Sequence, residues 1–188
     1  MVAKETPYAK RRRAKKPLDA GRLEELALAY VARYATSGAK LAAYLQRKIR
    51  ERGFDEESGE PGIDALVERY RGLGYVDDAG YARARAGDLT RRGYGPRRVE
   101  QALRAAGIAE NIREDSSASE AEARQAALVF VRRRRFGPFG EPVDPKTREK
   151  HVAAMIRAGH SFDAARALLD AESEDQATEW VAEAEGLD

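Results

Sequence analysis

Three glycines that follow similar apolar segments constrain the fold of this chain more than any other feature. Gly53, Gly107 and Gly159 are separated by 54 and 52 residues. Before each glycine, residues at steps of four share one face of a helix: Ser37, Leu41, Leu45 and Ile49; Gly95, Val99 and Leu103; Thr147, His151 and Met155. Glycine commonly ends helices because it tolerates the left-handed conformation. The spacing predicts a tandem repeat with about three helices in each period.

Helical signals cover the rest of the chain as well. Capping residues and prolines predict helix starts at Asp19, Ser37, Pro61, Asp77, Gly95–Pro96, Ser119, Asp144–Pro145, Ser161 and Ser173. The helix after Ser161 is expected to bury Phe162, whereas residues 109–115 predict only a short, poorly apolar helix. No segment alternates apolar and polar residues as a strand does. The sequence therefore predicts an all-α fold.

We expect three tandem three-helix repeats in an elongated array. A three-helix unit of this size buries little apolar surface alone, so neighbouring units should share interfaces. The expected modules span residues 18–76, 77–116 and 117–172. The alternative is a single helical bundle whose helices happen to end in glycine.

Charge is segregated at the two ends, although the formal net charge is only +2. Residues 1–20 carry seven Lys or Arg and two acids, and residues 160–188 carry one Arg and nine acids. We expect a disordered basic N-terminal arm over residues 1–17 and an acidic C-terminal helix or tail over residues 173–188.

Composition excludes several classes of protein. The 188 residues include no cysteine, which excludes disulfides, thiolate metal sites and cysteine nucleophiles and fits the reducing cytoplasm. The basic run from Lys10 to Lys16 is not followed by an apolar stretch, so it predicts neither a signal peptide nor a membrane span. The expected location is the cytoplasm.

The string Tyr75-Val76-Asp77-Asp78 permits two opposed interpretations. It matches a metal-binding motif of some template-copying polymerases, but that site needs a hairpin and a third acid, and the chain is too short for a polymerase. Paired aspartates also open helices, one by capping N–H groups and the other by its charge near the positive end of the dipole. We predict that Asp77 and Asp78 are structural caps.

No other motif predicts catalysis or a cofactor. Ser37-Gly-Ala-Lys40 matches the Ser-x-x-Lys of some acyl-transfer enzymes, but the other elements of that site are missing. His151 and His160 lack metal-ligand spacing, so structural roles are expected for both. We predict no catalytic residue, no metal and no cofactor, with Gly53, Gly107 and Gly159 as structural helix ends.

Arginines carry the only binding signal. Between Ala79 and Ile108 there are seven arginines and two acids, and a further run follows at 132–135. Successive helical residues turn by about 100°, so Arg134 lies beside the apolar stripe while its neighbours can point outward. The expected partner-binding residues are Arg83, Arg85, Arg91, Arg92, Arg97, Arg98, Arg132, Arg133 and Arg135.

Several segments resemble, in the same order, those of the RecX family of recombination regulators. They are "SGAKLAAYLQRKIRERGF", "LGYVDDAGYARA", "RRGYGPRRVEQALRAAGI", "RRRRFGPFG" and "DPKTREKHVAAMIRAGHSF". The resemblance covers roughly residues 23–170. It implies tandem three-helix repeats, no enzymatic activity, and binding to the filament of the RecA recombinase on DNA. It also implies inhibition of filament growth, ATP hydrolysis and strand exchange.

Direct DNA binding is the main alternative. Three-helix units resemble helix-turn-helix modules, and single- or double-stranded DNA could follow the basic surface. A helix that reads bases usually mixes Asn, Gln, Ser and Arg, whereas these helices carry mainly Arg and Ala. Any DNA binding should therefore be nonspecific. We expect a monomer without a membrane partner.

Overall fold

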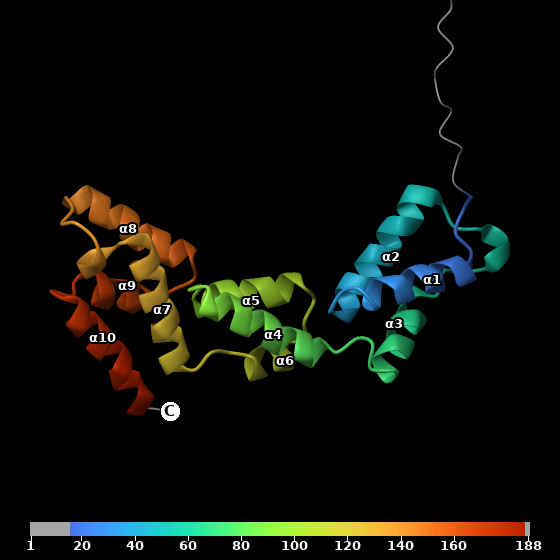
Figure 1. The fold of residues 1–188 in the computed structure, drawn as a ribbon. Helices are drawn as coiled ribbons and strands as arrows, with labels where there is room; N and C mark the ends of the chain where they lie inside the picture. The colour runs from blue at the N-terminus through green and yellow to red at the C-terminus, as the bar shows by residue number, and fades with distance from the viewer. Residues whose placement is uncertain (1–15, 187–188) are drawn as a thin grey trace, which may run out of the picture.

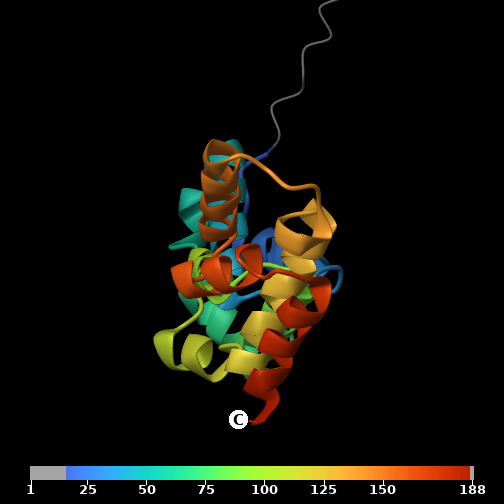
Figure 2. The ribbon, with the colours of Figure 1, turned by 90° about the vertical axis from the view of Figure 1, so that its left-hand side faces the viewer.

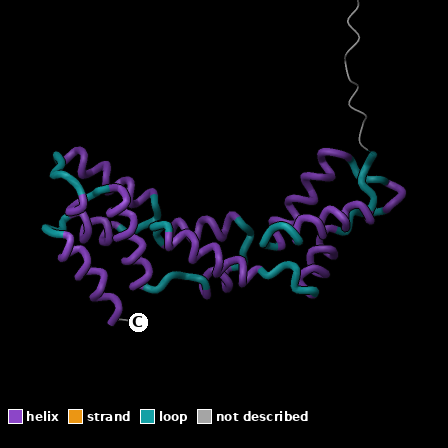
Figure 3. The backbone as a smooth tube through the Cα atoms, viewed as in Figure 1, coloured by secondary structure: helices purple, strands orange, loops and turns teal. Residues whose placement is uncertain are grey.

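The computed structural model describes residues 16–186, and these residues form helices joined by loops, with no strand (Figure 3). The prediction of an all-α fold is confirmed. Most of the basic arm predicted at residues 1–17 lies outside the described residues. No helix in the described part is long and apolar enough to cross a membrane.

Ten α-helices and three short 3-10 turns (η) follow one another along the described chain. They are α1 (Ala20–Val31), α2 (Gly38–Arg52), η1 (Glu56–Ser58), α3 (Ile63–Gly72), α4 (Asp78–Arg91), α5 (Pro96–Ala105), α6 (Glu110–Asp115), α7 (Glu120–Arg134), η2 (Gly137–Phe139), α8 (Pro145–Arg157), α9 (Phe162–Leu169), α10 (Glu174–Ala182) and η3 (Glu183–Gly186).

The apolar side chains are buried in three clusters. The first cluster lies within α1–α3 and their flanking loops and includes Leu23, Leu41, Leu45 and Tyr70. The second lies within α4–α6 and includes Leu89, Val99 and Leu103. The third lies within α7–α10 and includes Phe130, Met155, Leu168 and Val181. Tyr94 packs against both the second and the third clusters, whereas the first shares no residue with either.

The helices form a long, curved array (Figure 1). α8, α5 and α2 follow one another along its upper, concave side, and α10, α6 and α3 lie lower. The end-on view agrees, with α8 and α2 at the top and α6 and α10 at the bottom (Figure 2). We call α8, α5 and α2 the helix column.

The last turn of α8 caps the first turn of α5. The Gly95 N–H donates to the Ala158 carbonyl at 2.9 Å, and the Arg97 N–H donates to the Gly159 carbonyl at 3.2 Å. α5 has no side-chain cap of its own, so these backbone bonds satisfy N–H groups that a helix start otherwise leaves without partners. The contact also places a negative helix end against a positive one.

The end of α5 meets the start of α2 in a similar way. Ser37, the N-cap of α2, donates its hydroxyl to the Ala106 carbonyl at 2.6 Å. The Asp78 carboxylate accepts the Gly38 N–H at 2.8 Å and also pairs with Arg71. Burial opposes the charge of Arg71, but its hydrogen bonds with Asp78 and Glu68 outweigh that effect and raise its pKa.

Two of the repeat glycines therefore do more than end helices. Gly107 and Gly159 have φ of 69° and 97°. A Cβ on Gly107 would lie 2.3 Å from the Ala39 Cβ, and one on Gly159 would lie 2.4 Å from the Arg98 backbone nitrogen. Any side chain would push the column apart. Gly53 has φ 78°, and its nearest neighbour is 3.9 Å from the added Cβ, so it serves only as a helix end.

Asp77 is the N-cap of α4 and accepts the Gly80 N–H at 2.8 Å. Asp78 is the first helical residue, and its carboxylate faces α2 and α3 through Gly38 and Arg71. Both carboxylates are thus engaged in holding helices.

The structure corrects two expectations. The helix expected near Pro61 begins at Ile63, because Gly62 adopts a left-handed conformation immediately before it. Phe162 is 56% exposed, since it is the first residue of α9 and lies off the face formed by Ala165 and Leu168. The segment expected to form an acidic C-terminal helix or tail contains α10, which carries three acids outward while Ala177 and Val181 join the third cluster.

Both histidines are packed in the fold. His151 stacks on Phe136 with a centroid distance of 3.7 Å. His160 is 1% exposed, and its Nε2–H donates to the Gly93 carbonyl at 3.1 Å, which ties the start of α9 to the end of α4. Burial lowers the pKa of both imidazoles.

Substitution of Gly159 should test the helix column. Gly159→Ala introduces both a strained φ and a clash with α5, and we expect it to lower the free energy of unfolding by about 3 kcal/mol or more. Gly59→Ala is the matched control, because Gly59 has φ 74° but no atom within 4 Å of the added Cβ. It should cost about 1 kcal/mol. Equal costs in urea unfolding would contradict the close approach of the two helices.

Acid should weaken the joint that His160 forms. Because burial lowers the folded-state pKa of His160 below 6.5, the unfolded chain binds the proton more tightly. The contribution of His160 to the free energy of unfolding should therefore be fully present above that pH and be lost as the pH falls below it. His160→Gln keeps an N–H donor and should flatten the fall measured between pH 7 and pH 5. Parallel curves for the two proteins would assign the acid sensitivity to other groups, including His151.

Candidate partner-binding surface

The nine arginines predicted for partner binding do not form one patch. Arg83 and Arg91 line a cavity together with residues 115–118. Arg85 lines a different cavity, beside Tyr75 and Tyr81, and is paired with Asp88. The sequence alone could not show that these arginines point in different directions, because their directions depend on which neighbouring helix covers each side of α4.

Arg92 and Arg133 are brought together at the joint between α4 and α7. Arg92 pairs with Asp88, and its carbonyl accepts a hydrogen bond from the Arg133 guanidinium at 2.8 Å. Arg132 bonds to the Thr178 hydroxyl at 3.1 Å and lies over the Phe139 ring. Arg135 is the C-cap of α7 with a left-handed φ of 55°. The run at 132–135 is exposed, but two of its members also hold neighbouring helices in place.

Arg97 and Arg98 are exposed at the first turn of α5, where α8 ends. Arg98 bonds to Gln101 at 2.7 Å. The neighbouring Arg104 pairs with Glu100 and remains exposed. These arginines are the part of the predicted set that belongs to the helix column.

The helix column is strongly basic along its whole length. It carries five Lys or Arg in α2, three in α5 and four in α8, twelve in all, with a single Glu in each helix. α10 carries three acids and no base, and α6 carries three acids and one Arg. The basic and acidic helices lie on opposite sides of the array (Figures 1 and 2). The basic residues of the column are Lys40, Arg47, Lys48, Arg50, Arg52, Arg97, Arg98, Arg104, Lys146, Arg148, Lys150 and Arg157.

The basic residues of α2 and α8 were not predicted as site residues. A signal was present in the sequence, because the steps of four before Gly53, Gly107 and Gly159 place α2, α5 and α8 at equivalent positions in the repeat. The sequence does not predict the end-to-end contacts that align these three helices.

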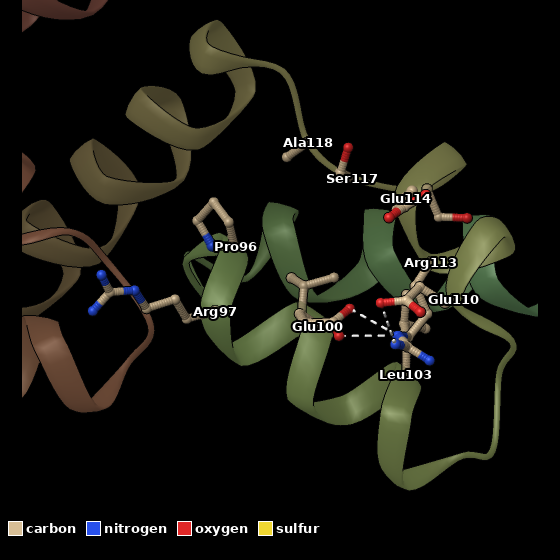
Figure 4. Close-up of a pocket in the computed structure, with 11 residues that line it drawn as sticks. Pro96, Arg97, Glu100, Leu103, Glu110, Arg113, Glu114, Ser117 and Ala118 are labelled. Atoms are coloured by element: carbon tan, nitrogen blue, oxygen red, sulfur yellow. Dashed lines mark hydrogen bonds and ion pairs between the residues drawn. The ribbon is translucent and has the colours of Figure 1, made fainter.

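A cavity between α5 and α6 has a volume of about 400 Å³ (Figure 4). Glu100 and Arg113 form an ion pair at 2.9 Å inside it, and Glu110 and Glu114 lie at its rim. Arg97 points away from these carboxylates, toward the neighbouring helices. Arg97 therefore forms no ion pair with the acids of this cavity.

The described residues contain no group of three or more acidic or histidine side chains that could hold a metal ion. The carboxylates of Asp77 and Asp78, which raised the metal hypothesis, diverge toward different helices.

Comparison with known proteins agrees with the fold and with the resemblance of the sequence. A family model described as "RecX, second three-helix domain" matches residues 77–116. The chain is 32% identical over 160 residues to the regulatory protein RecX of Myxococcus xanthus, covering 79% of this chain and 84% of the relative. It is 33% identical over 132 residues to the regulatory protein RecX of Halorhodospira halophila, covering 70% and 78%.

Solved structures share the fold at lower identity. The crystal structure of RecX from Lactobacillus salivarius superposes with a TM-score of 0.61 and 17% identity, over 81% of this chain and 97% of that one. A second crystal structure, of a regulatory protein RecX, gives a TM-score of 0.59 and 19% identity. These structures show the shared fold, and the sequence relatives establish that this chain belongs to the RecX family.

Proposed function

We propose that this protein is a non-enzymatic regulator of DNA recombination and repair that binds the RecA recombinase on DNA. Bound there, it inhibits filament growth, ATP hydrolysis and strand exchange. The observation that carries the proposal is the basic helix column along the concave side of a RecX-family chain.

The length and charge of the column suit a filament. At about 1.5 Å per residue, α2, α5 and α8 measure roughly 22, 15 and 20 Å, so their ends in contact give a basic track of more than about 50 Å. A long track of one sign attracts an extended acidic partner and speeds its encounter. A protein–DNA filament presents such a partner over many repeats.

The proposal includes three tandem modules of three helices, at residues 18–76, 77–116 and 117–172. Each would contribute its second helix to the column. α10 would then be an addition that closes the third module on its acidic side. A single chain presents all three column helices, so the proposal requires only a monomer.

Nonspecific DNA binding is the second candidate, because exposed guanidinium groups along a track would also bind phosphates. The two candidate functions differ in which ligand, the recombinase filament or naked DNA, the protein binds at the lower concentration. A regulator acts on the filament at protein concentrations well below those that bind naked DNA, whereas a DNA-binding module does the reverse.

Titration into a RecA filament on single-stranded DNA should lower the rate of ATP hydrolysis. We expect half-inhibition at a protein concentration at least tenfold below the dissociation constant for the same DNA without recombinase. Hydrolysis that is unchanged at saturating protein, combined with tight binding to naked DNA, would favour the DNA-binding module.

Loss of charge from the column should weaken filament binding. Arg97→Ser with Arg98→Ser should raise the half-inhibiting concentration about tenfold, because two exposed cations leave the centre of the track. Arg33→Ser with Arg166→Ser removes the same charge from α9 and the loop after α1 and should have little effect. Circular dichroism checks that both variants keep their helix content. Equal losses in the two variants would show that only net charge matters.

A further inference from the structure

Gly87 lies in the middle of α4, where the backbone does not require glycine. Its φ is not positive, and an added Cβ would meet only the end of the flexible Arg91 side chain, at 3.0 Å. Glycine inside a helix is less favourable than alanine, because it loses more conformational freedom on folding. The absent side chain leaves room on the surface of α4, and the Arg91 guanidinium lies over it.

Arg83 lies one turn before Gly87, and Arg91 lies one turn after it. Arg83, Gly87 and Arg91 follow one another at steps of four, so they lie along one face of α4. All three line a cavity of about 280 Å³. Its opposite wall comes from the loop before α7 and from the first turns of that helix, and includes Ser116, Ser117, Ala118 and Glu122.

The two guanidinium groups are free to bind a ligand. Within residues 16–186, neither Arg83 nor Arg91 forms an ion pair or a side-chain hydrogen bond, whereas Arg85 and Arg92, on the same helix, both pair with Asp88. Two acids also line the cavity. Glu122 is held by the Ser119 N–H as part of the capping box of α7, and Asp115 lies at the end of α6.

A second hollow of about 640 Å³ continues from the first between α4 and α7. The two share Thr90, Arg91 and Glu122. The rest of the lining of the second hollow is mainly small and apolar, with Ala121, Ala126, Val129 and Val181 beside one polar residue, Gln125. A polar end with two guanidinium groups thus opens into a less polar groove.

We propose that this continuous groove binds a nucleotide unit. Its phosphate would lie between Arg83 and Arg91, because planar guanidinium groups form paired hydrogen bonds with phosphate oxygens. The hydroxyls of Ser117 and Thr90 add donors near the same position. The sugar and base would lie in the less polar hollow beside Val129 and Val181. The site lies on α4 and α7, outside the helix column, and is independent of recombinase binding.

The same phosphate chemistry occurs in a free nucleotide and in a nucleic-acid strand. Isothermal titration calorimetry of the full chain with adenosine monophosphate, a ten-residue deoxythymidine strand and inorganic phosphate separates these sources. We expect adenosine monophosphate, the strand, or both to bind at least tenfold more tightly than inorganic phosphate. Binding of the mononucleotide identifies a free-nucleotide site, and binding of the strand alone identifies a strand site.

Two variants test the groove itself. Arg83→Gln with Arg91→Gln should weaken the observed binding at least tenfold. Gly87→Leu should do the same, because it keeps both charges but fills the cavity with a good helix former and displaces the Arg91 guanidinium. Arg33→Gln with Arg166→Gln is the charge-matched control and should bind as the parent does. Inhibition of recombinase ATP hydrolysis should be unchanged in Gly87→Leu, which removes no charge, so a failure here is distinct from a failure of the proposed function.

Three results would overturn the proposal. The first is no binding of either nucleotide probe at millimolar concentration. The second is inorganic phosphate binding as tightly as the nucleotides. The third is an equal loss of binding in the groove variants and the charge-matched control.

Discussion

The contact between the end of one helix and the start of another governs this structure. The Ala158 and Gly159 carbonyls accept the N–H groups of Gly95 and Arg97, and the Ala106 carbonyl accepts the Ser37 hydroxyl. Each contact satisfies polar groups that a helix end leaves without partners, and each sets opposite ends of helix dipoles together. Only glycine at 107 and 159 allows the approach. The curved array follows from these two joints.

The joints also determine where charge accumulates. The basic residues of α2, α5 and α8 are spread over more than a hundred residues of sequence, and the column brings them to one side. The acidic helices α6 and α10 lie away from that side. A chain with a net charge of only +2 can therefore attract an acidic filament through one face. This segregation connects the fold with the role that we propose.

Local features of the sequence predicted the helices well, and the reason is physical. The caps at Asp19, Ser37 and Asp77 and the capping box at Ser119 depend only on residues within one turn. Features that depend on distant parts of the chain were not predictable in the same way. The carboxylate of Asp78 was expected to act on its own helix, but it also holds Gly38 and Arg71. The arginines predicted to bind a partner point in several directions, because α6 and α7 cover different sides of α4.

Docking through the helix column is tested most directly by measuring which side of the array meets the recombinase. Because the chain contains no cysteine, a single Gln101→Cys on α5 or Glu110→Cys on α6 can carry an environment-sensitive fluorophore. Gln101 is exposed on the helix column, and Glu110 is exposed at the rim of the cavity between α5 and α6. We predict that a RecA filament on single-stranded DNA shifts the emission of the probe at 101. The emission of the probe at 110 should stay unchanged. A shift at 110 alone, or at neither position while ATP hydrolysis falls, would contradict docking through the helix column.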